Sequence, residues 1–259
     1  MTILPTGKIP SVFLSKLLDK YAPNCCDPRL VLGGQIGEDA AVIDMPESSS
    51  YIVAKTDPIT FATEEIGFYA VNINANDLAT RGAASKWFQA TILLPEGQTT
   101  EELVEFIFAD IKRACDELGI SVVGGHTEVT HGLPRPIIVG NMIGEVAKDK
   151  LVLTRGAQPG DAILLTKGAP IEGTAIIARE KYAELVERGY TEEFLARAKN
   201  YLHDPGISIQ KEALLLNEYF EVHAMHDPTE GGVTNGIAEM AAASGTGAVV
   251  GVANIPLVP

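Results

Sequence analysis

The chain has 259 residues, 46% of them apolar and 21% charged, a composition typical of a globular protein with one large domain or two ordinary ones. Its formal net charge of −14 argues against nucleic-acid binding, which needs clustered lysine and arginine. No apolar run approaches the roughly 20 residues that span a bilayer, and residues 1–10 lack the layout of a signal peptide. Three cysteines, two of them adjacent at Cys25 and Cys26, do not make a disulfide framework, so a cytoplasmic location is expected.

Hydrophobic periodicity predicts alternating helices and strands in the first half of the chain. Leu17 and Leu18 follow Ser11 at helical spacing, and Ser11 is a suitable helix cap. Thr99 and Glu102 have the spacing of a capping box at the start of an amphipathic helix. The other elements expected here are strands at 40–44, 51–55, 88–94, 120–123 and 136–146 and a helix at 63–81.

Turn-forming residues at 154–161 indicate a domain boundary near residue 150, which gives domains 1–150 and 151–259. The alternation of strands and helices predicts an α+β or mixed α/β architecture. The second domain is expected to be incomplete, because the chain ends at Pro259 just after a strand, with no helix to cover it. Its expected elements are strands at 162–166, at 222–225 and from Ala248, helices between Gly173 and Glu218, and a helix at 229–243.

Three acidic segments are candidates for a metal site. Gly37 and Asp39 belong to a turn that leads into a strand, and Asp57 follows the next strand. Asp77 lies in a helical segment rich in asparagine, a poor helix former. Carboxylate oxygens are the ligands that Mg²⁺ takes in proteins. Each segment also has an ordinary explanation: an acidic turn, a turn aspartate before proline, and a solvated Asp77–Arg81 pair.

Two glycine-rich segments are candidates for phosphate binding. Residues 124–128 place two glycines after an apolar strand, which lets the backbone approach a ligand closely. Residues 226–232 indicate a helix start, with Asp227 as the cap, Pro228 at the first helical position and Glu230 two positions further on. Helix N-termini bind anions through unpaired NH groups. A common Gly-Gly turn and plain helix capping are the alternatives.

Taken together, the five segments resemble the AIR-synthase-related, or PurM-like, superfamily in order and spacing. Its members include AIR synthase, thiamine-monophosphate kinase, selenophosphate synthetase and the hydrogenase-maturation dehydratase HypE. The resemblance covers essentially all 259 residues, and segment 226–232 is most similar to the hydrogenase-maturation branch. The matching motifs are Gly37 to Val42, Lys55 to Asp57, Asn76 to Ala79 with Gly82 and Ala83, and Gly124 to Glu128.

The resemblance implies a PurM-like two-domain fold in which the N-terminal domain forms a β-barrel shared within a homodimer. It implies ATP bound between two subunits, with Mg²⁺ held by Asp39, Asp57 and Asp77. The reaction it implies is phosphoryl transfer from ATP to a small-molecule or carbamoyl-type acceptor, with a maturation protein as a further partner. The catalytic residues stay open. The implied nucleotide-binding residues are Gly37, Asn76, Gly124, Gly125, Thr127, Asp227, Thr229, Gly231 and Gly232.

The sequence departs from the family pattern at two places. His126 stands where relatives commonly carry Asp or Glu, and Glu128 is the alternative ligand. No cysteine follows Cys115, whereas the hydrogenase-maturation branch carries its reacting group on a C-terminal cysteine. Three functions stay open: an ATP-dependent enzyme of the hydrogenase-maturation type, a small-molecule kinase similar to thiamine-monophosphate kinase, and a nucleotide-binding assembly or regulatory protein without turnover. No nucleic-acid or membrane partner is expected.

Two further expectations follow. A homodimer should form through the first half, because strands 88–94 and 136–146 are too apolar to be exposed as sheet edges. None of the cysteines should carry a reacting group, because Cys115 lies in the apolar stripe of a helix and Cys25 and Cys26 lie beside Asp27, which disfavours thiolate. The chain is therefore expected to bind Mg-ATP without completing carbamoyl transfer.

Overall fold

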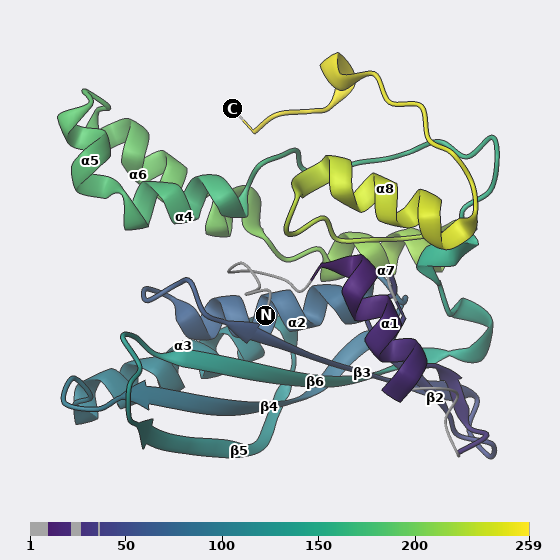
Figure 1. Ribbon diagram of the computed structural model, residues 1–259, viewed down its shortest axis with the longest axis horizontal. Helices are drawn as coiled ribbons and strands as arrows, with labels where there is room; N and C mark the ends of the chain where they lie inside the picture. The colour runs from purple at the N-terminus through teal and green to yellow at the C-terminus, as the bar shows by residue number, and fades with distance from the viewer. Residues whose placement is uncertain (1–9, 22–26, 36, 259) are drawn as a thin grey trace.

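The computed structural model describes residues 10–21, 27–35 and 37–258. Its first half is a six-stranded sheet in the order β1-β2-β3-β6-β4-β5, seen in the lower part of Figure 1. Neighbouring strands are antiparallel except for the parallel pair β4–β5. The strands are β1 (Leu30–Leu32), β2 (Ala41–Asp44), β3 (Ser50–Ile59), β4 (Ala84–Pro95), β5 (Ser121–Thr130) and β6 (Ile137–Ala147).

Helix α2 (Ile66–Ala79) lies on one face of the sheet, against β3, β4 and β6, and α3 (Glu101–Leu118) packs beside it. Alternation along β6 turns Ile138, Met142 and Val146 to this face, where each is buried. Burying a side chain of this size stabilises the fold by about 1.5–3 kcal/mol. The core of the first half therefore lies between the sheet and α2, and the second half of the chain covers the other side of α2 (Figure 1).

All 14 residues of α2 are buried, including asparagines that usually avoid helix interiors. Their amides are used for hydrogen bonds to other segments. Asn74 Oδ1 accepts from the backbone N of Asp57 at 2.8 Å, and Asn76 Nδ2 donates to the carbonyl of Ile207 at 2.8 Å. Gly140 leaves room for this arrangement, since a Cβ there would lie 2.4 Å from Asn74 Nδ2. The asparagines therefore fix α2 against β3 and against the second half.

The second half is mainly helical, and three strand predictions for it are wrong. Residues 162–166, 222–225 and the segment after Ala248 form no strand; within the described residues, this half has one isolated bridge, between Ala169 and Leu257. A ladder needs a partner strand in register, which apolar periodicity alone cannot supply. The helices are α4 (Glu172–Glu180), α5 (Tyr182–Glu187), α6 (Glu192–Asn200), α7 (Gln210–Tyr219) and α8 (Gly232–Ser244), with short turns η1 (Lys148–Lys150), η2 (Thr154–Gly156), η3 (Leu202–Gly206) and η4 (Val252–Asn254).

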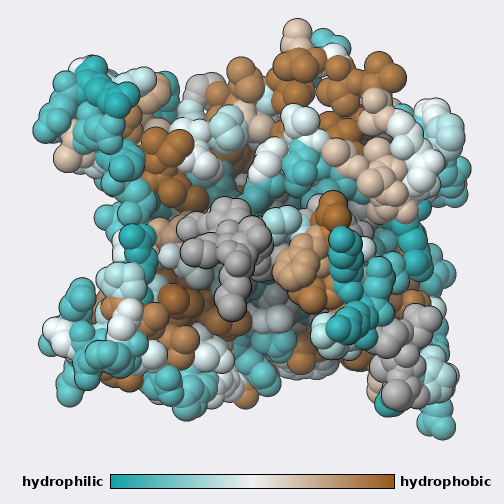
Figure 2. Space-filling model, in the orientation of Figure 1, coloured by the Kyte–Doolittle hydropathy of each residue, from teal (hydrophilic) through white to brown (hydrophobic). Residues whose placement is uncertain are grey.

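The C-terminal segment consequently leaves apolar side chains exposed. Val249, Val252 and Leu257 are 100%, 79% and 74% exposed. Figure 2 shows brown, apolar surface at the top of the molecule, where Figure 1 draws this yellow segment. Among the described residues, none of the helices is long and apolar enough to cross a membrane.

The predicted helices of the first half are present with shifted ends. The helix expected at 63–81 is α2, which is shorter, and the helix at Ser11 is α1 (Ser11–Tyr21). Thr100, rather than Thr99, caps α3: its hydroxyl accepts from the backbone N of Leu103 at 3.2 Å, while Thr99 bonds the carbonyl of Pro95. Strand β1 was not predicted, and its three residues are too few to show a period.

The reasoning behind the expected dimer needs correction. Strands β4 and β6, which cover the apolar segments 88–94 and 136–146, are interior strands of the sheet. The edges are β1 and β5 instead, and on β5 Val122, Val123 and Val129 are 47%, 48% and 57% exposed. Pairing of sheets through the first half would therefore use an edge strand, and β5, with ten residues against three in β1, is the longer of the two.

Candidate functional site

Arg81 organises the first part of the site. It directly follows the C-cap of α2, Thr80, and is fully buried. Its guanidinium forms an ion pair with the buried carboxylate of Glu38 and lies 3.0 Å from Asp39 Oδ2. It also donates to Thr154 Oγ1 at 2.6 Å and to the carbonyl of Met225 at 3.2 Å. One buried side chain thus joins segments that are more than 180 residues apart.

The surface pair predicted between Asp77 and Arg81 is not formed. The helix ends at Ala79, so the two side chains do not share a helical face as residues four apart would. Asp77 instead faces Lys55, whose Nζ lies 3.3 Å from Asp77 Oδ2 and 3.4 Å from Asp57 Oδ2. Asp77 Oδ2 is buried, and the geometry of that ion pair does not provide it with a hydrogen bond.

His226 brings the second half into the site. Its Nδ1 lies 3.0 Å from Asp39 Oδ2 and its Nε2 lies 2.8 Å from Glu239 Oε2 on α8. Asp39, His226 and Asp227 each offer one atom to a group in which all three atoms lie within 4.8 Å of one another. The site therefore combines the loop before β2, the end of β3, the end of α2 and the loop before α8.

The carboxylates of this site are not fully balanced by its cations, and the pKa values of Asp39, Asp77 and Asp227 reflect this imbalance. Burial raises the pKa of Asp77 well above its usual value, and the nearby Asp227 charge raises it further. Burial and the Asp39 charge raise the pKa of Asp227 to about 8. Burial opposes ionisation of Asp39 too, but His226, Arg81 and Lys55 outweigh it and lower its pKa. His226, Arg81 and Lys55 thus compensate the charge of Asp39, whereas burial outweighs the nearby cations at Asp77 and Asp227.

These observations indicate how a metal ion would fit. A buried carboxylate oxygen without a hydrogen bond, beside carboxyl groups whose ionisation is suppressed, is a position that a divalent cation stabilises. Lys55 Nζ lies between Asp57 and Asp77, so an ion shared by these two aspartates requires the lysine side chain to rotate away. The donor set fits Mg²⁺ on this condition.

The loop before α8 differs from the predicted capping pattern. The helix begins at Gly232, and Gly231 with φ 86° is its N-cap, so the prediction of Asp227 as the cap is wrong. The backbone N of Gly232 donates to the carbonyl of Thr229 at 3.0 Å. Left-handed φ values at Gly231 and Gly232 explain the two glycines.

The other residues predicted to bind the nucleotide lie in three different parts of the structure. Gly37, with φ 83°, lies against α8, where its Cβ would be 3.4 Å from the carbonyl of Glu239. Asn76 is occupied by the backbone of residues 207–209 and is 7% exposed. Gly124, Gly125 and Thr127 lie on edge strand β5, with β4 and β6 between them and β3. At about 4.8 Å per strand, this separates them from Asp57 by roughly 14 Å.

His126 and Glu128 do not join the cluster. They pair with each other on β5, with 3.1 Å between Nε2 and Oε2 and both side chains at least half exposed. Cys115 is buried, and burial raises the pKa of its thiol to about 12, which supports the expectation of an inert thiol. Cys25 and Cys26 lie outside the described residues.

Sequence reasoning missed several residues of the site. Lys55 and His226 lie inside motifs that the sequence analysis recognised, but no function was predicted for either side chain. Thr154 and Glu239 lie in segments without any recognised motif.

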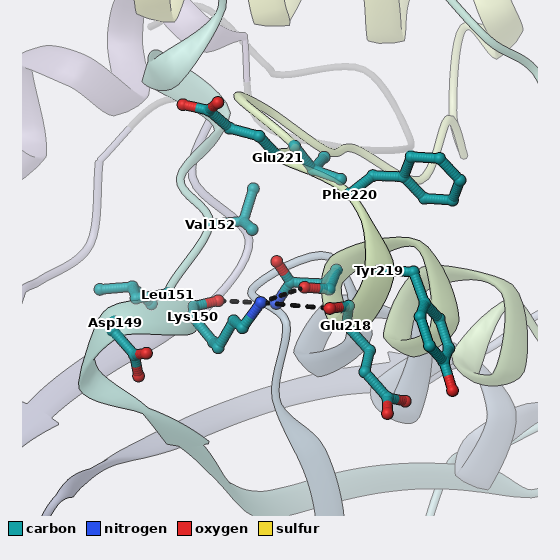
Figure 3. Close-up of a pocket in the computed structure, with 10 residues that line it drawn as sticks. Asp149, Lys150, Leu151, Val152, Glu218, Tyr219, Phe220 and Glu221 are labelled. Atoms are coloured by element: carbon teal, nitrogen blue, oxygen red, sulfur yellow. Dashed lines mark hydrogen bonds between the residues drawn. The ribbon is translucent and has the colours of Figure 1, made fainter.

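A hollow of about 300 Å³ lies elsewhere, between η1 and the end of α7. There Lys150 Nζ donates to the carbonyls of Asn217 and Glu218, as the dashed lines in Figure 3 show. This lysine closes the end of a helix, a structural role.

Comparison with known proteins defines the class of protein. Residues 37–146 match the N-terminal domain of AIR synthase related protein, and residues 158–258 match its C-terminal domain. Selenide, water dikinase of Aeromonas salmonicida is 30% identical over 253 residues, which cover 96% of this chain and 69% of that protein. The chain belongs to the AIR-synthase-related family.

Relatives named for hydrogenase maturation also match. Carbamoyl dehydratase HypE of Cupriavidus necator is 29% identical over 236 residues, covering 86% of this chain and 62% of that protein. A Methanocaldococcus jannaschii protein named for hydrogenase expression and formation is 30% identical over 200 residues, covering 77% of this chain and 56% of its own length. The chain thus spans about three fifths of the length of these relatives.

Solved structures establish the same fold. A thiamine-monophosphate kinase structure, ThiL complexed with AMPPCP and TMP, has a TM-score of 0.68 at 22% identity, covering 90% of this chain and 69% of its own. HypE in complex with ATP has a TM-score of 0.62 at 24% identity, covering 92% and 67%. The mixed α+β fold of this chain is therefore PurM-like.

Proposed function

We propose that this chain binds Mg-ATP at the carboxylate cluster and uses it in phosphoryl-transfer or activation chemistry of the hydrogenase-maturation type. The observation that carries the proposal is that Lys55 Nζ lies 3.4 Å from Asp57 Oδ2 and 3.3 Å from the buried Asp77 Oδ2, close enough to Asp39 to be affected by its charge. Family membership supports it, because relatives include a carbamoyl dehydratase and a dikinase, and a HypE structure contains ATP. The chain's own activity and substrates are part of the proposal.

The proposed roles follow from charge. Asp39, Asp57 and Asp77 hold Mg²⁺, which neutralises the charge of the phosphates when bound. Lys55 moves from its position between Asp57 and Asp77 to the phosphates, which releases both carboxylates for the ion. The backbone NH groups of Thr229 and Gly231, in the loop before α8, are offered to a phosphate, and that of Gly232 becomes available when it releases the carbonyl of Thr229.

The residues on β5 require a second copy of the chain in this proposal. Gly124, Gly125 and Thr127 are too far along the sheet from β3 to serve the nucleotide held by the same cluster. A homodimer paired along the exposed edge β5 lets them serve the nucleotide site of the second copy instead. A closed barrel formed by two such sheets would also remove the unpaired edge.

Two other functions remain candidates. A small-molecule kinase is supported by the fold similarity to ThiL with AMPPCP and TMP. A non-catalytic nucleotide-binding assembly protein is supported by the exposed His126–Glu128 pair, which lies outside the cluster. A maturation protein is the partner proposed for the enzyme, by analogy with the HypE–HypF complex. Nucleotide turnover measured with a carbamoylated acceptor, with thiamine monophosphate and with no acceptor separates the three functions.

Nucleotide binding itself is tested by thermal denaturation. Saturating Mg-ATP at 100 times its dissociation constant should stabilise the folded state by about 2.7 kcal/mol. Asp77→Asn should fold, because asparagine is nearly isosteric with aspartate, and should weaken the shift. Asp19→Asn, on the exposed surface of α1, is the matched control and should keep the full shift. A folded protein that shows no shift with Mg-ATP would contradict the proposal.

A further inference from the structure

We propose that the hollow between η1 and the end of α7 is a docking site for a partner protein, and that it receives an arginine side chain from a short apolar segment of that partner. The hollow is lined by residues 149–152, in the segment that joins the two family-matched regions, and by residues 217–222 at the end of α7. It shares no residue with the carboxylate cluster proposed to bind Mg-ATP. The inference is therefore independent of the proposed function.

The hollow carries unbalanced negative charge. Asp149, Glu218 and Glu221 line it, together with one cation, Lys150. The Lys150 ammonium already donates to two backbone carbonyls at the end of α7, as the dashed lines in Figure 3 show. Among the described residues, neither Asp149 nor Glu218 has an ion-pair partner, and Glu221 has only a nitrogen of His223 at 3.7 Å. A cationic group that enters the hollow therefore meets carboxylates that are not otherwise neutralised.

Two aromatic rings lie beside these carboxylates and outside the core. Tyr219, the last residue of α7, and Phe220, its C-cap, are 70% and 66% exposed. In Figure 3 both rings lie on the side of the hollow that α7 forms. Two adjacent rings in water forgo the stabilisation that burial gives to side chains of this size. Aromatic residues are enriched in the buried centres of protein interfaces, so these rings indicate a surface that a partner covers.

The combination of carboxylates and rings selects the chemistry of the occupant. A guanidinium is planar, pairs with a carboxylate through two N–H groups and stacks on an aromatic face. An ammonium is more strongly hydrated and forms neither the paired hydrogen bonds nor the stack. The volume of about 300 Å³ lies at the small end of ligand sites and suits one long side chain. The exposed rings offer apolar contact to the residues on either side of that arginine.

Two other occupants are less well matched to this surface. A second copy of the chain is disfavoured by charge, because each copy carries a net charge of −14 and would approach a hollow that is itself acidic. A free polyamine supplies positive charge but leaves the rings of Tyr219 and Phe220 uncovered. Charge and exposed aromatic surface together therefore favour a partner protein that presents arginine.

The test is a titration of the nucleotide-free chain into a fluorescently labelled pentapeptide whose central arginine is flanked by leucines and glycines, followed by fluorescence anisotropy. The arginine peptide should bind about tenfold more tightly than the same peptide with citrulline, which keeps the shape and lacks the charge. Asp149→Asn and Glu218→Gln should each weaken the arginine peptide about fivefold and leave the citrulline peptide unchanged. Glu193→Gln, at an exposed carboxylate on α6, is the matched control and should change neither affinity. No binding, or equal affinity for the two peptides, overturns the inference.

The aromatic rings and the other occupants are tested separately. Phe220→Ala should fold, because the ring is exposed, and should weaken the arginine peptide about tenfold. If light scattering shows that Phe220→Ala dissociates a wild-type dimer, the surface belongs to a second copy and the inference is wrong. Spermidine that displaces the peptide at equal concentration would make the hollow a polyamine site instead, and unchanged affinity in all the hollow variants would place the peptide elsewhere. A chain that binds Mg-ATP but not the peptide refutes this inference alone, whereas peptide binding without Mg-ATP binding refutes only the proposed function.

Discussion

Replacing Arg81 by methionine should be among the most destabilising single substitutions in this chain. The guanidinium is fully buried, and its partner Glu38 has a side chain only 2% exposed. Methionine replaces the aliphatic stem of the side chain but leaves the Glu38 carboxylate buried with only backbone donors, from Thr154 and Arg155. Breaking a buried pair by removing one partner costs about 3–5 kcal/mol. At about 2–4 °C per kcal/mol, the melting temperature should fall by about 10 °C.

The assay is urea unfolding followed by the fluorescence of Trp87, the single tryptophan of the chain. The double variant Arg81→Met with Glu38→Met should be more stable than Arg81→Met alone, because it removes the stranded charge as well. Arg29→Met breaks an exposed Arg–Asp pair, with side chains 50% and 44% exposed, and should change little. A loss below about 1 kcal/mol for Arg81→Met, or a double variant less stable than the single one, would refute the reasoning.

Three further predictions test other parts of the structure. Burial raises the pKa of Glu172 to about 7, so the stability that its protonated form contributes is full below pH 4.5 and is lost as the pH rises through 7. At pH 8, Glu172→Gln should therefore be more stable than wild type by up to about 3 kcal/mol and unfold at a higher temperature. At pH 4 the variant should have no such advantage. Gly140→Ala should lose about 1–3 kcal/mol in urea unfolding by displacing Asn74, whereas Gly173→Ala, whose Cβ meets no atom within 4 Å, should be neutral or stabilising. Light scattering should show a dimer that Val123→Lys, on the exposed edge β5, converts to monomer, and a wild-type monomer at micromolar concentration would contradict the dimer.

The local pattern of the sequence predicted most of the first half. Helix α3 follows from its apolar stripe, although Thr100 and not the predicted Thr99 caps it. Strands β4 and β6 follow from their apolar alternation, because each signal is contained within its own segment. The same reasoning failed for residues 162–166 and 222–225. Their apolar character indicates burial, but a strand exists only where another strand lies in register beside it.

The sequence by itself also determined which residue types the site would contain, since Asp39, Asp57 and Asp77 were each marked by a motif. Only the tertiary structure decided their partners. Arg81 pairs with Glu38 and Asp39 rather than Asp77, because α2 ends two residues before it. His226 meets Glu239 and Asp39, 13 and 187 residues away, only because α8 packs over the loop before β2. Ion pairs and metal ligands depend on where distant loops converge, and no local period encodes that convergence.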